Sequence, residues 1–79
     1  MGTKAIALAF GEVLRDCRTR SGITQENLAF KADLDRTYIS LLERGLRQPT
    51  LETLFRLAGV LEIAPATMIA RTSSRISGV

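Results

Sequence analysis

The sequence of 79 residues contains no histidine, no tryptophan and a single cysteine, Cys17. Without histidine there is no His-dependent catalytic triad, and without histidine or paired cysteines there is no zinc site. A lone cysteine suits a reducing compartment, and we interpret Cys17 as a small buried hydrophobe in preference to a reactive thiol. We therefore expect neither an enzyme nor a protein that holds a metal or another cofactor.

Long hydrophobic runs are also absent, since no stretch approaches the roughly 18 apolar residues of a membrane span. Residues 5–10, which follow Lys4, are apolar and bear a slight likeness to a signal peptide. This run is short, however, and passes directly into a charged amphipathic pattern. The sequence therefore predicts a cytoplasmic protein without membrane contact.

Hydrophobic residues make up 46% of the chain, which is enough for one compact core. With only three Phe and one Tyr, that core must be built mainly from Leu, Ile, Val and Ala. The formal net charge of +3 is compatible with a nucleic-acid partner, but many inert domains are as basic. We expect one domain over residues 1–79.

Apolar residues recur at spacings of three and four along the whole chain, which predicts five helices and no strand. Residues 1–6 and 74–79 are expected to be frayed. The first helix should span about residues 7–20, and the fourth and fifth should begin after Thr50 and at Pro65. The predicted inward stripes contain Phe10, Val13, Leu14, Cys17 and Ser21 in the first helix and Leu51, Leu54, Leu57, Ala58 and Leu61 in the fourth. The apolar positions of the fifth helix are Met68, Ile69 and Ile76.

Residues 22–45 are the centre of the pattern, because they predict two short helices, about 24–32 and 36–44, joined by a tight corner. Thr24 and Asp35 are suited to cap the two helices. Leu34 should plug the corner into the core, and the inward residues should be Leu28, Ala29, Ala32, Ile39 and Leu42. Phe30 lies outside this stripe, so it either covers the edge of the first helix or contacts a partner.

Two short helices with a tight corner form the helix-turn-helix arrangement, whose second helix enters the major groove of DNA. The predicted outward residues of that helix, which we expect to contact bases, are Arg36, Thr37, Tyr38, Ser40 and Leu41. Arginine can donate to two acceptors of guanine, and the threonine methyl group suits thymine. Leu41 can make only an apolar contact.

Phosphates of the DNA backbone should be bound by residues on either side of that helix. The candidates are Thr24, Gln25, Arg44, Arg47 and Gln48. Gln25 can either bond a phosphate or brace Arg36. The alternative for Arg44 and Arg47 is that they are ordinary solvated charges.

These residues also carry a family resemblance. Residues 24–32, TQENLAFKA, resemble the T-Q-x-x-L-A-x-K-A pattern of the Cro and phage-repressor type, or XRE, family of helix-turn-helix regulators. The similarity continues through Ile39-Ser40, Glu43-Arg44-Gly45 and Pro49-Thr50-Leu51, and covers about residues 8–70. Residues 34–40, LDRTYIS, resemble the recognition helix of controller proteins of restriction–modification systems.

The resemblance implies a compact, all-α, five-helix domain of the lambda-repressor type that binds a palindromic operator as a homodimer and represses or activates transcription. It implies base contacts from Arg36 and Thr37, with Tyr38 beside them, and an ion pair between Arg18 and Glu43. Regulators of this family can also touch RNA polymerase through the surface on which Glu26 lies. Two positions depart from the usual pattern: Leu41 replaces a polar residue, and Ala64 replaces a polar cap.

A single helix in one groove buries too little surface for tight binding, so a stand-alone domain of this size needs a dimer. We expect the last two helices to form it, with contacts from Phe55, Val60, Ile69 and Ile76, and Met68 and Ile69 belong either to the core or to this surface. The alternative function is an antitoxin-like or other protein-interaction module with autoregulatory DNA binding. The few residues after Ile69 argue against it, because they are too few to hold a partner.

Overall fold

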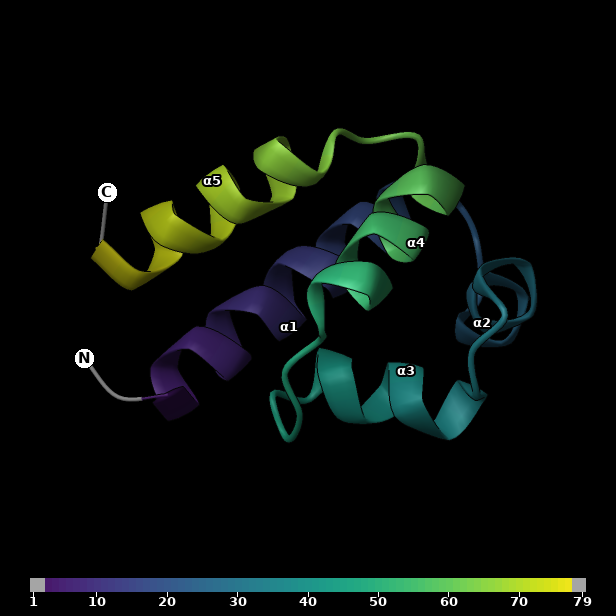
Figure 1. Cartoon of the computed structure of the whole chain (residues 1–79), viewed down its shortest axis with the longest axis horizontal. Coiled ribbons are helices and arrows are strands. Elements are labelled where there is room, and N and C mark those ends of the chain that lie inside the picture. The colour runs from purple at the N-terminus through teal and green to yellow at the C-terminus, as the bar shows by residue number, and fades with distance from the viewer. Residues whose placement is uncertain (1–2, 78–79) are drawn as a thin grey trace.

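The computed structural model describes residues 3–77, which form five helices joined by short turns (Figure 1). The helices are α1 (Thr3–Arg20), α2 (Gln25–Ala32), α3 (Arg36–Glu43), α4 (Leu51–Leu61) and α5 (Pro65–Ser77). No strand occurs in this described part of the chain. The all-α, five-helix prediction is confirmed.

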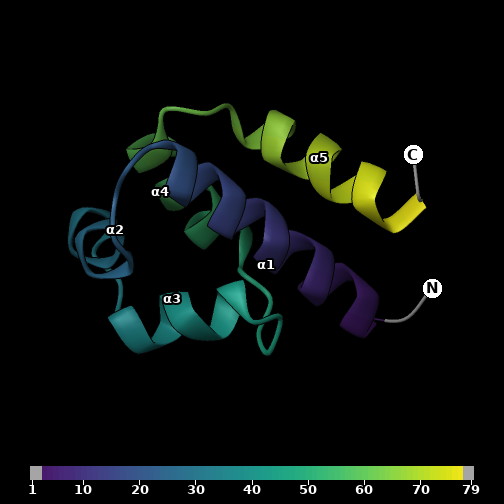
Figure 2. The same cartoon turned by 180° about the vertical axis from the view of Figure 1, so that it is seen from behind.

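Helix α1 is the central element. It packs against α5 along one side and against α3 on another, and α2 in turn contacts α3 and α4 (Figures 1 and 2). The chain runs in opposite directions in α1 and α5, so the first turn of α1 and the last turn of α5 lie at the same end of the molecule. Helix α3 lies along the edge opposite α5, and its outer side is free of other helices (Figure 1).

The core lies between these helices and consists mainly of aliphatic side chains. Its fully buried members include Val13, Leu14, Cys17, Leu28, Ile39, Leu42, Leu57 and Met68. Leu34 is half-buried and packs against this cluster, as the sequence predicts. Two predicted core positions are wrong: Ser21 is exposed and Leu51 is 71% exposed. Both lie at helix ends, where the apolar stripe continues but no neighbouring helix covers it.

Residues 3–6 and 74–77, for which the sequence predicts fraying, are helical in the structure. Helices α1 and α5 support each other along their length, because Ala7 and Thr72 are buried and Arg75 pairs with Glu12 at 3.1 Å. Packing of this kind stabilises helical turns that local propensity leaves marginal. Residues 1–2 and 78–79, to which the same prediction applied, lie outside the described residues.

Helices α1 and α3 approach so closely that only glycine fits at residue 11. A Cβ atom at this position would overlap the backbone carbonyl oxygens of Leu42 and Glu43. The last turn of α3 therefore rests directly on the backbone of α1, which fixes the position of α3 relative to the rest of the domain.

Candidate nucleic-acid interface

The corner between α2 and α3 is built by backbone and cap hydrogen bonds. The Thr24 hydroxyl accepts from Asn27 N at 3.1 Å, and the Asp35 carboxylate accepts from Thr37 N at 3.0 Å. Asp33 ends α2 in the left-handed conformation (φ 58°), which aspartate tolerates better than most residues. Leu34 N then donates to Ala29 O at 2.8 Å. Both predicted caps are confirmed.

Helix α3 is anchored by one face. Ile39 and Leu42 have no exposed surface, and Glu43 is 8% exposed. Tyr38 is half-buried and packs against the core, whereas the sequence predicts an outward position for its ring. This face leaves the remaining side of α3 free to contact another molecule.

Glu43 joins three parts of the fold. Arg18 on α1 donates to it twice, from Nε to Oε2 at 2.5 Å and from Nη2 to Oε1 at 3.1 Å. Arg18 Nη1 also donates to the Ile23 carbonyl at 2.9 Å. The expected ion pair between Arg18 and Glu43 is therefore present, with side chains only 13% and 3% exposed. Because a paired arginine and carboxylate of this kind are directional, the contact fixes α3 against α1.

Gln25, the first residue of α2, is held by the same carboxylate. Its Nε2 donates to Glu43 Oε1 at 3.0 Å. The prediction that Gln25 either bonds a phosphate or braces Arg36 missed this contact, which directs its amide nitrogen to Glu43 at the end of α3. Sequence spacing gave no signal for it, because the two residues are brought together only by the corner.

The outer side of α3 carries the predicted base-contacting residues. Arg36 and Thr37 are exposed at its first turn, while Ser40 and Leu41 are half-buried further along. The structure therefore brings together Arg36, Thr37, Ser40 and Leu41, with Tyr38 at their border. Arg36 also borders the start of α2, where it lines a shallow hollow with Thr24, Gln25 and Glu26.

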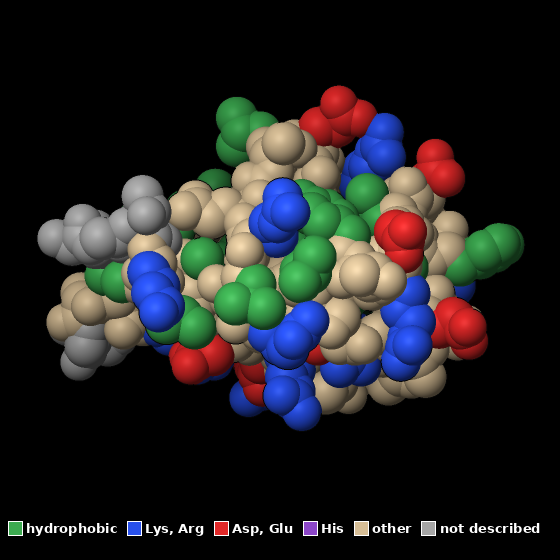
Figure 3. Space-filling view, turned by 90° about the horizontal axis from the view of Figure 1, so that it is seen from below, with side chains coloured by type: hydrophobic (Ala, Val, Ile, Leu, Met, Phe, Trp, Pro, Cys, Tyr) green, Lys and Arg blue, Asp and Glu red, His purple; other side chains and the backbone are tan. Residues whose placement is uncertain are grey.

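Positive charge extends beyond α3. Arg44 ends the helix, and the loop to α4 presents Arg47 and Gln48, all three exposed. Across residues 3–77, none of the ion pairs involves Arg36, Arg44 or Arg47. Figure 3 shows Lys and Arg side chains spread over this side of the molecule, up to the end where α1 begins. Such a surface is complementary to a polyanion.

A second surface is apolar. A groove between α1, α4 and α5 is lined by Ile6, Phe10, Leu51, Leu54 and Ile69, among others. Of the predicted dimer contacts, Phe55 and Ile69 are 61% and 50% exposed, and Val60 and Ile76 are half-buried. Val60 lines a different hollow, beside Lys31 at the end of α2. The sequence analysis did not include Ile6 and Leu51 in this apolar surface, although Leu51 lies one helical turn before Phe55.

The outer side of α2 carries an isolated aromatic ring. Phe30 is 84% exposed, so the alternative that it covers the edge of α1 is wrong. Glu26 lies one helical turn before it and is also exposed.

Among residues 3–77, no three His, Cys, Asp or Glu side chains are grouped so that they could hold a metal ion. No single described helix is long and apolar enough to cross a membrane, and by length and composition alone only the pair α4 and α5, which is bent by 107°, could.

Comparison with known proteins places this arrangement among transcriptional regulators. The helix-turn-helix family matches residues 14–67. Control protein C.BamHI of Bacillus amyloliquefaciens is 39% identical over 72 residues, which cover 90% of this chain and 89% of that protein. The restriction–modification controller protein C.AhdI from Aeromonas hydrophila is 42% identical with a TM-score of 0.76, over 78% of this chain and 94% of that one. The controller protein C.Esp1396I, solved as a tetramer in complex with its natural 35 base-pair operator, is 34% identical with a TM-score of 0.79, over 90% and 93%.

Proposed function

The chain belongs to the helix-turn-helix family, and we propose that it is a transcriptional regulator of the restriction–modification controller type, which binds a palindromic operator sequence-specifically as a homodimer. The observation that carries the proposal is the geometry of α3. One face of this helix is fixed by buried residues and by Glu43, and the opposite face presents unpaired, exposed side chains that suit the major groove. Such a protein acts in the cytoplasm and has no enzymatic activity.

In this proposal Arg36 and Thr37 make the principal base contacts, because the first turn of the recognition helix enters the groove most deeply. Ser40 and Leu41 contact the next base pairs, and Leu41 packs on a thymine methyl group. Tyr38 lies at the border of the contact surface, where its hydroxyl donates a hydrogen bond to a phosphate of the DNA backbone.

Phosphates are bound at both ends of α3. Thr24 and Gln25 lie at the start of α2, whose unpaired backbone N–H groups favour a phosphate. Arg44, Arg47 and Gln48 bind the backbone at the other end. These contacts set register and affinity, whereas the contacts of Arg36 and Thr37 set specificity.

The dimer forms through the apolar groove between α1, α4 and α5. Leu51 and Ile69 line it and are 71% and 50% exposed, and Phe55, which is 61% exposed, lies one helical turn after Leu51 on α4, which leaves apolar surface that a second copy can bury. A symmetric pair of this kind places two copies of α3 about one helical turn of DNA apart. Palindromy of the operator follows from the two-fold axis.

The outer side of α2 suits a contact with RNA polymerase when the regulator activates. Glu26 and Phe30 are exposed one turn apart, and Phe30 has no packing role in the fold. A Glu26→Lys protein should bind DNA at least as tightly as the wild type, because Glu26 borders Arg36 and the new positive charge attracts the DNA backbone, and it should lose activation in a reporter assay. Unchanged activation would remove this surface from the proposal.

Binding-site selection from random duplex DNA tests the proposed function. We expect the enriched sequences to share a palindrome whose half-sites lie about one helical turn apart. The same sequence should lie upstream of the genes that the protein controls. Failure to enrich any sequence would contradict the proposal.

A further inference from the structure

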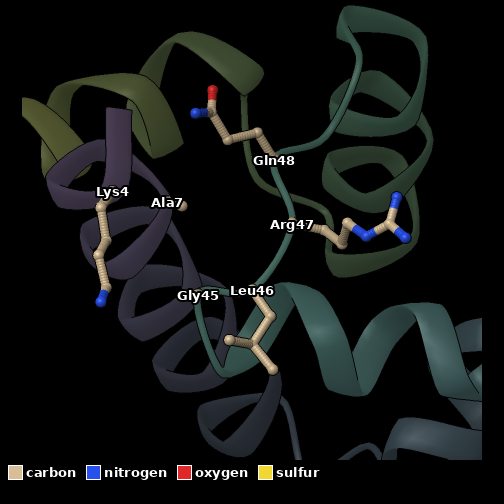
Figure 4. Close-up of a pocket in the computed structure, with 6 residues that line it drawn as sticks. All are labelled: Lys4, Ala7, Gly45, Leu46, Arg47 and Gln48. Carbon is tan, nitrogen blue, oxygen red and sulfur yellow. The ribbon is translucent and has the colours of Figure 1, made fainter. Parts of the chain in front are cut away.

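A hollow between the first turn of α1 and the loop from α3 to α4 lies beside the surface assigned above to DNA. It is lined by Lys4, Ala7, Gly45, Leu46, Arg47 and Gln48. Figure 4 shows the two cations on either side of the loop, with Lys4 on α1 and Arg47 projecting from the loop away from α1. Both side chains are exposed.

The second turn of α1, directly after Lys4, packs closely against this loop. Ala7 is buried, and Leu8 packs so closely on Gly45 that a Cβ atom at residue 45 would lie 2.8 Å from Leu8 Cα. One turn further along, Gly11 lies on the carbonyl oxygens that end α3. The position of Lys4 relative to the end of α3 is therefore set by packing of the backbone.

The charge of Lys4 does not serve the fold. A cation in the first turn of a helix is at the unfavourable end of the macrodipole, and the first turn of α1 contains no acidic residue. In the described part of the chain, neither Lys4 nor Arg47 takes part in an ion pair. Two positive charges thus flank the hollow without compensation from the protein.

We propose that Lys4 binds the sugar–phosphate backbone of DNA beyond the base pairs that α3 contacts, with the hollow between α1 and Gly45–Gln48 seated over that backbone. The inference rests on the proposed function and extends its surface to a helix outside the helix-turn-helix. Helix α3 ends at this loop, so a strand that borders the groove and meets Arg44 and Arg47 continues toward Lys4. A flexible lysine is suited to a phosphate, which needs a point charge and no fixed geometry.

The salt dependence of binding tests the proposal. The probe is the duplex enriched from random DNA, with its flanking base pairs retained, and affinity is measured by fluorescence anisotropy over a range of NaCl concentrations. Each phosphate contact contributes about 0.9 to the slope of log K against log salt, so a dimer of Lys4→Ala should lose about 1.8. Lys4→Arg should restore the wild-type slope.

Lys31→Ala is the matched control, because it also removes one exposed lysine, from the last turn of α2 at the opposite end of the molecule (Figure 1). We expect its slope to equal that of the wild type. As a second measurement, a neutral methylphosphonate placed in the flank should weaken the wild type and leave the Lys4→Ala protein unchanged. Equal slopes for Lys4→Ala and Lys31→Ala would overturn this inference alone, whereas a wild type that enriches no sequence would overturn the proposed function as well.

Discussion

Glu43 is the single residue on which the position of α3 depends most. Its carboxylate accepts from Arg18 on α1 and from Gln25 on α2, and its side chain is only 3% exposed. A carboxylate in the last turn of a helix is unfavourable for the macrodipole, so this residue makes sense only with its arginine partner. The hydrogen bonds to Glu43 therefore offset the unfavourable position of its charge and fix the orientation of α3.

We expect Glu43→Gln to lower the free energy of unfolding by about 3 kcal/mol, because it leaves the Arg18 guanidinium largely buried without a counter-charge. Urea denaturation followed by circular dichroism measures the change. Asp16→Asn is the control, since the Asp16–Arg20 pair is much more exposed and should contribute no more than about 1 kcal/mol. Equal losses for the two variants would show that the Glu43 network does not anchor α3.

Arg36 is the residue whose replacement should change specificity. Arg36→Ala should cost about 1–3 kcal/mol of binding and relax the preference at one base pair of each half-site. Arg44→Ala should instead weaken binding to all sequences alike and lower the salt slope. Competition binding with single-base variants of the selected operator separates the two outcomes. A uniform loss for Arg36→Ala would identify Arg36 as a phosphate contact.

At the scale of elements, local chemistry was sufficient to predict where α2, α3 and α4 begin. Thr24, Asp35 and Thr50 cap α2, α3 and α4 through their own side chains, and such contacts span only two or three residues. Helix periodicity also identified the inward faces. Neither signal could show that no helix covers Leu51, or that Gln25 meets Glu43, because both depend on how the helices are placed in space.

The contact between α1 and the end of α3 gives a prediction for the turn at Gly45. Gly45 and Gly22 both have φ of +73°, but only Gly45 has a neighbour, Leu8, where a Cβ atom would lie. Gly22→Ala should therefore cost about 1 kcal/mol for the left-handed backbone alone, and Gly45→Ala should cost clearly more. Thermal unfolding of the two proteins gives the difference. Equal melting temperatures would mean that Leu8 on α1 can shift to accommodate the added methyl group with no loss of stability.

At the scale of the whole molecule, the cationic and apolar surfaces are made mainly by different elements of one small domain and adjoin at Gln48. Arg36, Arg44 and Arg47 lie along α3 and its loop, while Leu51 and Ile69 line the groove between α1, α4 and α5. The existence of both surfaces could be predicted from exposed residue types, since Phe55 and Ile69 lie on the exposed apolar surface. The exact apolar set could not, because Val60 lies on a separate hollow.

This separation allows dimerisation to be tested independently of DNA contact. Ile69→Asp places a charge in the groove, where pairing two copies would bury it, so we expect the variant to sediment as a monomer in analytical ultracentrifugation. Because Ile69 is 50% exposed in one copy, the variant should still fold, which circular dichroism can verify. Phe30→Asp is the control, because Phe30 is 84% exposed on α2, away from the groove, and its loss should leave the dimer intact.

The two variants also show how much dimerisation contributes to the affinity for the full operator. A monomer that retains Arg36 and Arg44 should still bind a single half-site weakly, and its affinity for the full palindrome should fall to that same value, since the second half-site no longer adds to the first. A dimeric Ile69→Asp protein together with a monomeric Phe30→Asp protein would move the interface to α2. In that case Phe30, and not the groove, would set the spacing of the two recognition helices on DNA.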